Sequence, residues 1–209
     1  MPKIKMPRSS PSLDMTPMVD LAFLLVTFFM LTAQFRPEEA AAVDTPSSQS
    51  ESPIPLDGLM TISVDSTGRV FWDLTEKKVR IAVLEKMAER YNLTFSNDQK
   101  NRFAGLSAIG MPINKLGDFL DLDSGPDRKE FMAANDGIPL DSVDNQLQWW
   151  IYETNTLFYS QISKKVLVAL KADGNTPYTR VNEVIKTFQG PSIQINRFKM
   201  ITDLEESRL

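Results

Sequence analysis

The longest apolar stretch of the 209-residue chain lies close to its N-terminus. Residues 15–35 read MTPMVDLAFLLVTFFMLTAQF, and residues 21–33 within them are polar only at Thr27 and Thr32. A helix of 21 residues is about 31 Å long, which is close to the thickness of the hydrocarbon core of a membrane. The pattern therefore predicts a single transmembrane helix over residues 13–35.

Two other interpretations of this stretch stay open. A cleaved signal peptide has a basic start, a short apolar run and small residues beyond it, and Ala40–Ala42 could form its cleavage site. The chain would then be an exported periplasmic binding protein, although Asp20 at the head of the run argues against this. A buried helix of a soluble domain is the other alternative, because length alone does not separate it from a membrane span.

The charges that flank the apolar stretch give it an orientation. Residues 1–12 carry Lys3, Lys5 and Arg8 and no acid, whereas Arg36 is the one base close behind the stretch. The positive-inside rule places residues 1–12 in the cytoplasm and everything beyond residue 35 outside it. In a Gram-negative bacterium, the long C-terminal part is then periplasmic.

Polar residues form a stripe along the predicted helix. At about 100° per residue, Thr16, Asp20, Thr27 and Gln34 fall within a sector of about 40°. Such a stripe is typical of a helix that lines a hydrated path or packs against polar partner helices. In the alternative interpretation, the threonine hydroxyls bond to carbonyls of their own helix and Asp20 lies near the headgroups.

Asp20 is the most informative residue of the stripe. A carboxyl at the centre of a span costs about 2.5–3.5 kcal/mol on insertion scales, so such a residue is a functional candidate. Low-dielectric surroundings disfavour the charged form of a carboxyl, which can then take a proton from one side and release it to the other. We interpret Asp20 as a proton carrier. Pro17, three residues earlier, is harmless at a helix start but would free a carbonyl further in.

The rest of the chain predicts a linker and one folded domain. Residues 36–57 are rich in Pro, Ser, Glu and Ala, which is typical of a semi-extended linker. Residues 58–209 are predicted to form an α+β domain in the order ββα–insert–βαβ, with the helices packed on one sheet. The expected strands are residues 60–65, 69–73, 166–170 and 193–201, and the expected helices are residues 76–91, capped by Thr75, and 177–189, closed by Gly190.

The insert, at about residues 94–163, has a less legible pattern. Asp141 or Ser142 could cap a helix that places Val143, Leu147, Trp150 and Ile151 on one face. Trp149 and Trp150 are expected in the core, with an interface anchor as the alternative.

Composition removes several classes of chemistry. The chain has no Cys and no His, which excludes disulfides, a Cys nucleophile, a Cys/His zinc site and a His base. It contains no Gly-rich phosphate-binding motif, so we expect no cofactor, no metal and no enzymatic activity. The net charge is −4, and the long C-terminal part has no basic stripe, so we expect no nucleic acid partner.

The run from Ser12 to Ala33, SLDMTPMVDLAFLLVTFFMLTA, resembles the N-terminal motif of the ExbD/TolR family of biopolymer-transport proteins. Thr16, Pro17 and Asp20 occupy motif positions, and Asp20 matches the essential membrane carboxyl of the family. Asp14 stands where family members often have Asn. A weaker likeness, VLVALKADGNTPY, covers residues 166–178. The resemblance extends over residues 1–92 and 164–205.

This resemblance implies a role and partners. Family members sit in the inner membrane beside an ExbB/TolQ-like ring protein, and use the proton gradient to energise a TonB-like or TolA-like protein that reaches the outer membrane. Two copies place their helices inside the ring, which implies a homodimer. The resemblance thus implies proton translocation by Asp20, with Thr16 and Thr27, and a structural role for Pro17, Asp14 and Gln34. A TolR-like or stator-like anchor that binds peptidoglycan stays open as an alternative.

Overall fold

The computed structural model describes residues 15–32, 47–48, 58–122, 125–141, 144–201 and 203–204. The chain divides into two units, Met1–Arg36 and Pro37–Leu209. The predicted cytoplasmic residues 1–12, Asp14, Gln34 and most of the predicted linker 36–57 lie outside the described residues.

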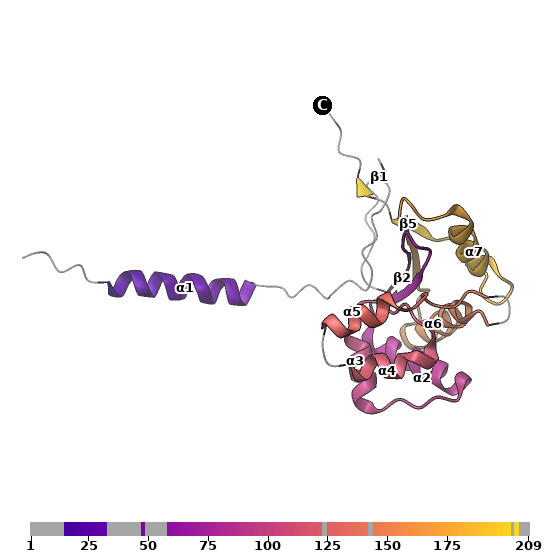
Figure 1. Ribbon diagram of the computed structural model, residues 1–209, viewed down its shortest axis with the longest axis horizontal. Helices are drawn as coiled ribbons and strands as arrows, with labels where there is room; N and C mark the ends of the chain where they lie inside the picture. Colours follow the sequence, from indigo (N-terminus) through magenta and orange to yellow (C-terminus); the bar gives the residue numbers. More distant parts are fainter. Residues whose placement is uncertain are drawn as a thin grey trace, which may run out of the picture. The chain divides into compact units, whose positions relative to one another are not determined.

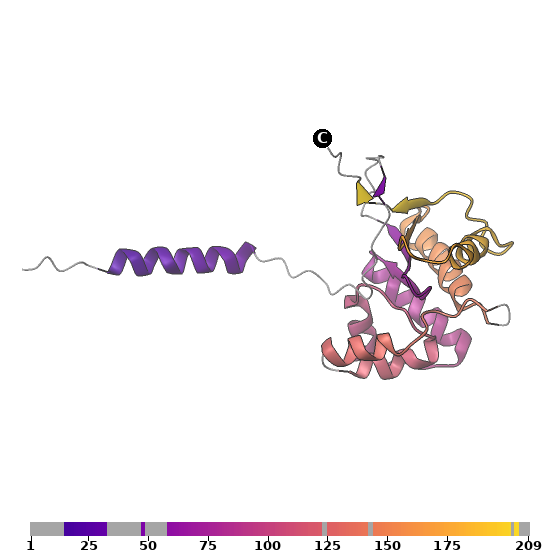
Figure 2. The same ribbon diagram turned by 45° about the horizontal axis from the view of Figure 1, so that its top comes forward.

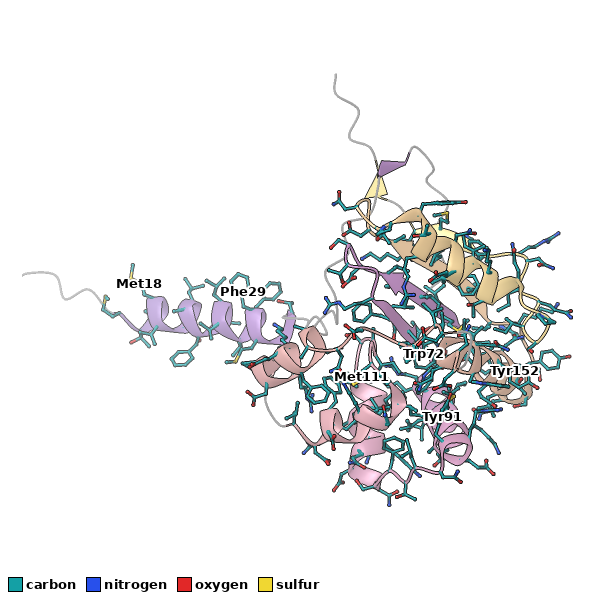
Figure 3. The ribbon with its side chains drawn as sticks, turned by 45° about the vertical axis from the view of Figure 1, so that its right-hand side comes forward. Met18, Phe29, Trp72, Tyr91, Met111 and Tyr152 are labelled. Atoms are coloured by element: carbon teal, nitrogen blue, oxygen red, sulfur yellow. The ribbon has the colours of Figure 1, made fainter. Side chains whose placement is uncertain are left out.

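The first unit contains helix α1, Thr16–Thr32 (Figure 1). Pro17 is the second residue of this helix, where its missing N–H has no intrahelical partner to lose, so it starts the helix without distorting it. The apolar side chains of α1 are exposed, and Figure 3 shows Met18 and Phe29 projecting from it. Within the described ranges, no helix is both long enough and apolar enough to cross a membrane.

The second unit is built on a four-stranded sheet with the order β3-β2-β4-β5. β2 and β3 form an antiparallel hairpin, and β2 with β4 and β4 with β5 are parallel. The strands are β2 Leu59–Val64, β3 Val70–Leu74, β4 Leu167–Ala172 and β5 Lys199–Ile201, and the helices are α2 Lys77–Tyr91, α3 Asn97–Gly105, α4 Ile113–Asp121, α5 Gly125–Ala133, α6 Gln146–Ile162 and α7 Tyr178–Gln189. The predicted order ββα–insert–βαβ is confirmed.

Two short strands lie outside this sheet. β1, Ser47–Ser48, pairs in parallel with β6, Asp203–Leu204. β1 belongs to the predicted linker, so this pairing adds a short strand that the composition of residues 36–57 did not indicate.

The register of the sheet gathers its large apolar side chains on one face. Ile62 lies opposite Trp72 on β3 and Leu170 on β4, so the three side chains point to the same side. Buried residues of α2, α6 and α7 belong to the same core cluster. Figure 3 shows Trp72 inside this unit and Tyr152 at its surface, and α7 lies at the opposite end from α3, α4 and α5 in Figures 1 and 2.

The predicted insert supplies α3, α4, α5 and α6 and closes the β3 edge of the sheet. Trp72 N donates to Ile109 O at 2.8 Å, Ile109 N donates to Trp72 O at 2.9 Å, and Ile138 N donates to Val70 O at 2.9 Å. Phe71 points to the other face of the sheet, yet it is only 2% exposed. A Cβ at Gly110 would lie 2.1 Å from the Phe71 ring, so glycine is needed for this close approach. The insert is therefore part of the fold and no peripheral addition.

Two predicted helix caps are wrong. The Thr75 hydroxyl accepts a hydrogen bond from Leu59 N at 3.0 Å and donates to Leu59 O at 3.1 Å, so it joins β2 instead of capping α2. Glu76 is the N-cap and makes no side-chain cap bond. Helix α6 is capped by Asn145, whose Oδ1 accepts from Gln148 N at 2.9 Å, and not by Asp141; Ser142 and Val143 lie outside the described residues.

The predicted strand 193–201 is correct only for its last three residues. Ile193 N and Gln194 N donate to Gly190 O, and Ile195 N donates to Phe188 O at 2.9 Å. These bonds hold residues 193–195 in a turn at the end of α7. The residues therefore do not form a strand, although their apolar and polar positions alternate. The other predicted strands and α7 begin or end within a few residues of the observed bounds.

The two adjacent tryptophans have different surroundings. Trp150 is fully buried, with its ring centroid 5.0 Å from that of Trp72, which confirms the core interpretation for this residue. Trp149 is half-buried, and the Arg90 guanidinium carbon lies 3.5 Å from its ring centroid. Arg90 also binds Glu153 at 3.1 Å.

Candidate functional site

Asp20 is the one charged residue of α1 and lies in its second turn. Thr16 precedes it by four residues, so the two side chains are neighbours on the helix surface. Together with Met15, Pro17, Val19 and Phe23, they line a shallow hollow along the helix. The structure thus brings three predicted motif residues, Thr16, Pro17 and Asp20, onto one short stretch of surface.

Thr27 lies seven residues beyond Asp20, two turns along the same side of α1. Its hydroxyl donates to Phe23 O at 2.8 Å, and the Thr32 hydroxyl donates to Phe28 O at 2.8 Å. Both hydroxyl protons are held by the helix backbone, as the alternative interpretation of the stripe expected for the threonines. Thr27 Oγ1 keeps acceptor capacity. Asp14 and Gln34 lie outside the described residues.

The surroundings of Asp20 on α1 are apolar. Each of the following side chains is at least half exposed: Met18, Val19, Leu21, Phe23, Leu24, Leu25, Val26, Phe28, Phe29, Met30 and Leu31. A continuous exposed apolar surface of this kind is typical of a helix that is covered by lipid or by another protein. The helix therefore carries one ionisable group within an otherwise apolar, exposed surface.

In the folded unit, Asp65 is the centre of a hydrogen-bond network that the sequence patterns did not single out. Asp65 is 3% exposed, and its carboxylate accepts from Thr67 N, Thr67 Oγ1, Arg69 N and Arg69 Nε at 2.7–3.0 Å. Burial acts to raise the pKa of Asp65, but these hydrogen bonds and the Arg69 charge outweigh it and lower the pKa below its ordinary value. The Asp-Ser-Thr-Gly turn after β2 was the available sequence signal.

The same turn is joined to the segment between β4 and α7. The Thr176 hydroxyl donates to Asp65 O at 2.9 Å, and Arg180 Nε donates to Gly68 O at 3.0 Å. Thr176 belongs to the run that carries the weaker family likeness at residues 166–178. The likeness therefore coincides with a structural junction of the sheet.

Arg80 is a buried cation at the centre of the folded unit. It is 3% exposed, and its Nη1 donates to Asp73 Oδ1 at 2.7 Å and to the carbonyls of Leu74 and Ser107. Its guanidinium lies over the Trp72 and Phe103 rings at 5.6 and 5.3 Å. Burial lowers the pKa of Arg80 and raises the pKa of Asp73, each opposed by the attraction between them. The ion pair joins α2 to β3, and the hydrogen bond from Arg80 to Ser107 O joins α2 to the insert.

No group in the described ranges gathers three or more carboxylates around a common point that could hold a metal ion. Asp20 is the one ionisable group on the exposed apolar surface of α1.

Comparison with known proteins identifies a family. A family model described as biopolymer transport protein ExbD/TolR matches residues 6–116. The match includes Thr16, Pro17 and Asp20 and extends past residue 92 into the predicted insert, while residues 164–205 lie outside it. No curated protein and no solved structure matches the chain significantly. Because the family match spans more than half of the 209 residues, the chain belongs to the ExbD/TolR family of biopolymer transport proteins.

Proposed function

We propose that this chain is a non-enzymatic subunit of an inner-membrane complex that converts proton flow into work on the cell envelope. Residues 13–35 form its membrane span, the N-terminus is cytoplasmic and residues 58–209 are periplasmic. An ExbB/TolQ-like ring protein surrounds the helices of two copies, and a TonB-like or TolA-like protein receives the work. The observation that carries the proposal is Asp20, which stands alone on an exposed apolar helix inside the family match.

The proton step is assigned to Asp20. Transfer of a carboxylate into low-dielectric surroundings is costly, whereas transfer of the neutral acid costs less. Protonation of Asp20 would therefore change which surface of the ring protein the helix binds. Taking a proton from one side and losing it to the other would then move the helix against its ring. Thr16 contributes a polar neighbour one turn away. Thr27 can accept a hydrogen bond but has its own proton held by Phe23 O, so its contribution is to hold water or a partner group.

The remaining motif residues have supporting roles in this proposal. Pro17 fixes the start of α1, and Asp14 and Gln34 would extend the polar stripe at the two ends of the span. The proline-rich linker 36–57 sets the distance at which the folded unit works.

The substitution Asp20→Asn tests the proposal in a strain that lacks its chromosomal copy. Asparagine keeps the size and hydrogen bonding of Asp20 but cannot carry a proton. We expect normal amounts of protein in the membrane fraction and loss of energy-dependent uptake across the outer membrane. Thr32→Val is the matched control, because Thr32 lies off the stripe and is expected to retain uptake. Full uptake with D20N at normal expression would contradict the proposal.

Two further measurements separate this proposal from its alternatives. N-terminal sequencing of the mature protein is expected to start within residues 1–12, and loss of residues 1–35 would mark an exported, cleaved protein instead. Retention of the chain on isolated peptidoglycan, without recovery of a TonB-like or TolA-like protein, would favour an anchor.

A further inference from the structure

A groove in the folded unit has no role in the proton step. It has a volume of about 780 Å³ and lies between the second half of α6, the start of β4 and the segment before β5. Its lining residues are Asn155, Thr156, Tyr159, Lys165, Val166, Val168, Ile193, Gln194, Ile195, Asn196 and Arg197. α6 belongs to the insert, so this groove combines the insert with the sheet.

The groove exists because residues 193–197 do not continue β5. β5 pairs only with Ala169–Lys171, so the first part of β4 has no β5 neighbour. The backbone bonds to the end of α7 hold the preceding segment away from the sheet, and Gln194 takes a left-handed conformation with φ at 52°. A non-glycine residue in this conformation is disfavoured and often marks a functional segment. The local fold thus maintains a gap where the sequence pattern predicts a strand.

The electrostatic character of the groove is positive, in a chain whose net charge is −4. Lys165 and Arg197 line it, and no acidic residue does. No ion pair within the described part of the chain involves either cation. Residues 163–172 and 191–201 contain five bases and no acid in all. The lining of the groove therefore carries two cations and no acid.

The uncharged lining adds two further kinds of contact. Asn155, Gln194 and Asn196 supply amide donors and acceptors. Val166 and Val168, which are 9% and 5% exposed, form part of the floor of the groove. The backbone amides and the carboxylates of an extended peptide match the amide groups and the positive charge of the groove.

We propose that this groove binds an extended acidic segment of a protein partner, with Lys165 and Arg197 binding its carboxylates. Complementary charge would speed the encounter and set the register of the segment, and salt would weaken both effects. The proposal goes beyond the proton step and is independent of Asp20, so the two can fail separately.

Binding of synthetic peptides to the full chain in neutral detergent tests this proposal. The probe is a fluorescein-labelled octapeptide of alternating Glu and Val, with Gln–Val and Lys–Val octapeptides for comparison, followed by fluorescence anisotropy. We expect the Glu–Val peptide to bind at least about tenfold more tightly than the other two. We expect the double variant K165E/R197E to lose at least about tenfold in affinity.

Matched variants separate charge from folding. K77E/K78E makes the same charge change on the exposed start of α2, away from the groove, and is expected to bind like the natural chain. Thr156→Trp fills the groove without changing charge and is expected to weaken binding. Equal affinity for the Glu–Val and Lys–Val peptides, or unchanged affinity in K165E/R197E, would overturn the proposal. Binding of isolated peptidoglycan but not of the Glu–Val peptide would also overturn it.

Discussion

At the scale of single residues, the folded unit depends on two buried ionic groups with opposite environments. Asp65 is surrounded by donors, which keep its carboxylate charged despite burial. Arg80 has one carboxylate partner, and its Nε and Nη2 atoms are buried without a hydrogen bond to a described residue. The burial of both residues could not be predicted from the pattern of apolar positions, because that pattern assigns charged residues to the surface or to a turn.

We predict that Asp65→Asn reduces the dependence of stability on acid. The folded-state pKa of Asp65 lies below its ordinary value of 3.8, so its stabilisation is complete above that value and is lost as the pH falls through the folded pKa. The free energy of unfolding of the natural chain, measured by urea denaturation, should therefore fall more between about pH 5 and pH 2.5 than that of D65N. Parallel pH profiles of the two proteins would contradict this account.

A second residue-scale prediction concerns the Arg80–Asp73 pair. Arg80→Met keeps the apolar stem but leaves the Asp73 carboxylate half-buried without its cation, so we expect a loss of about 2–4 kcal/mol in unfolding free energy. Adding Asp73→Asn to R80M should recover part of this loss, because the unpaired charge is then removed. The prediction is wrong if D73N lowers the free energy of unfolding by the same amount in R80M as it does in the natural chain.

At the scale of elements, the spacing of apolar residues predicted most helices and strands, but it did not predict the residues at which they begin and end. The hairpin, α2 and α7 follow from the spacing of Ile62, Val64, Leu84, Met87 and Val184, which are all buried. The cap of α2 was misplaced because the Thr75 hydroxyl bonds across to Leu59, a contact that local sequence does not encode. The strand predicted at residues 193–198 was wrong for a different, local reason: the N–H groups of residues 193–195 bond to carbonyls at the end of α7, three to seven residues earlier.

The corrected cap of α2 leads to a stabilising prediction. Glu76 has an extended conformation at the N-cap but makes no cap bond, so Glu76→Ser would supply the missing acceptor. We expect a gain of about 0.5–1 kcal/mol in urea denaturation. Thr75→Ala should instead destabilise the chain, because it removes two hydrogen bonds to β2. A loss of stability in E76S would contradict the assignment of Glu76 as an N-cap that lacks a cap bond.

The contact between the insert and β3 can be tested with two glycines. Gly110→Ala would place a Cβ 2.1 Å from Phe71, and we expect a loss of about 1–3 kcal/mol or more in unfolding free energy. Gly105→Ala is the control, because a Cβ there meets nothing within 4 Å at the end of α3. Its effect should be small or stabilising. Equal effects of the two substitutions in urea denaturation would contradict the packing described for the β3 edge.

At the scale of the whole molecule, the chain consists of one apolar helix and one folded unit with its own core. The candidate site on α1 could be predicted because it rests on a short run of adjacent residues, whose angular spacing is fixed by the helix. The groove of the folded unit could not be predicted from the sequence, because its lining combines residues 155–168 with the distant residues 193–197. The position of the second segment depends on backbone hydrogen bonds to the end of α7.

We predict that a chain starting at Pro37 folds without α1. The three tryptophans, Trp72, Trp149 and Trp150, all lie in the second unit, so their fluorescence reports on its unfolding. Urea should produce one cooperative transition with the same midpoint as in the full chain. A non-cooperative transition would show that the second unit depends on residues 1–36.

The central claim is that Asp20 carries protons, and proton flux tests it most directly. The chain is expressed together with an ExbB/TolQ-like ring protein, and dissipation of an imposed pH gradient is followed in inverted membrane vesicles. We predict proton flux in vesicles with the natural chain and with T32V, and none above background with D20N at the same amount of protein. Equal flux with the natural chain and with D20N would contradict the account.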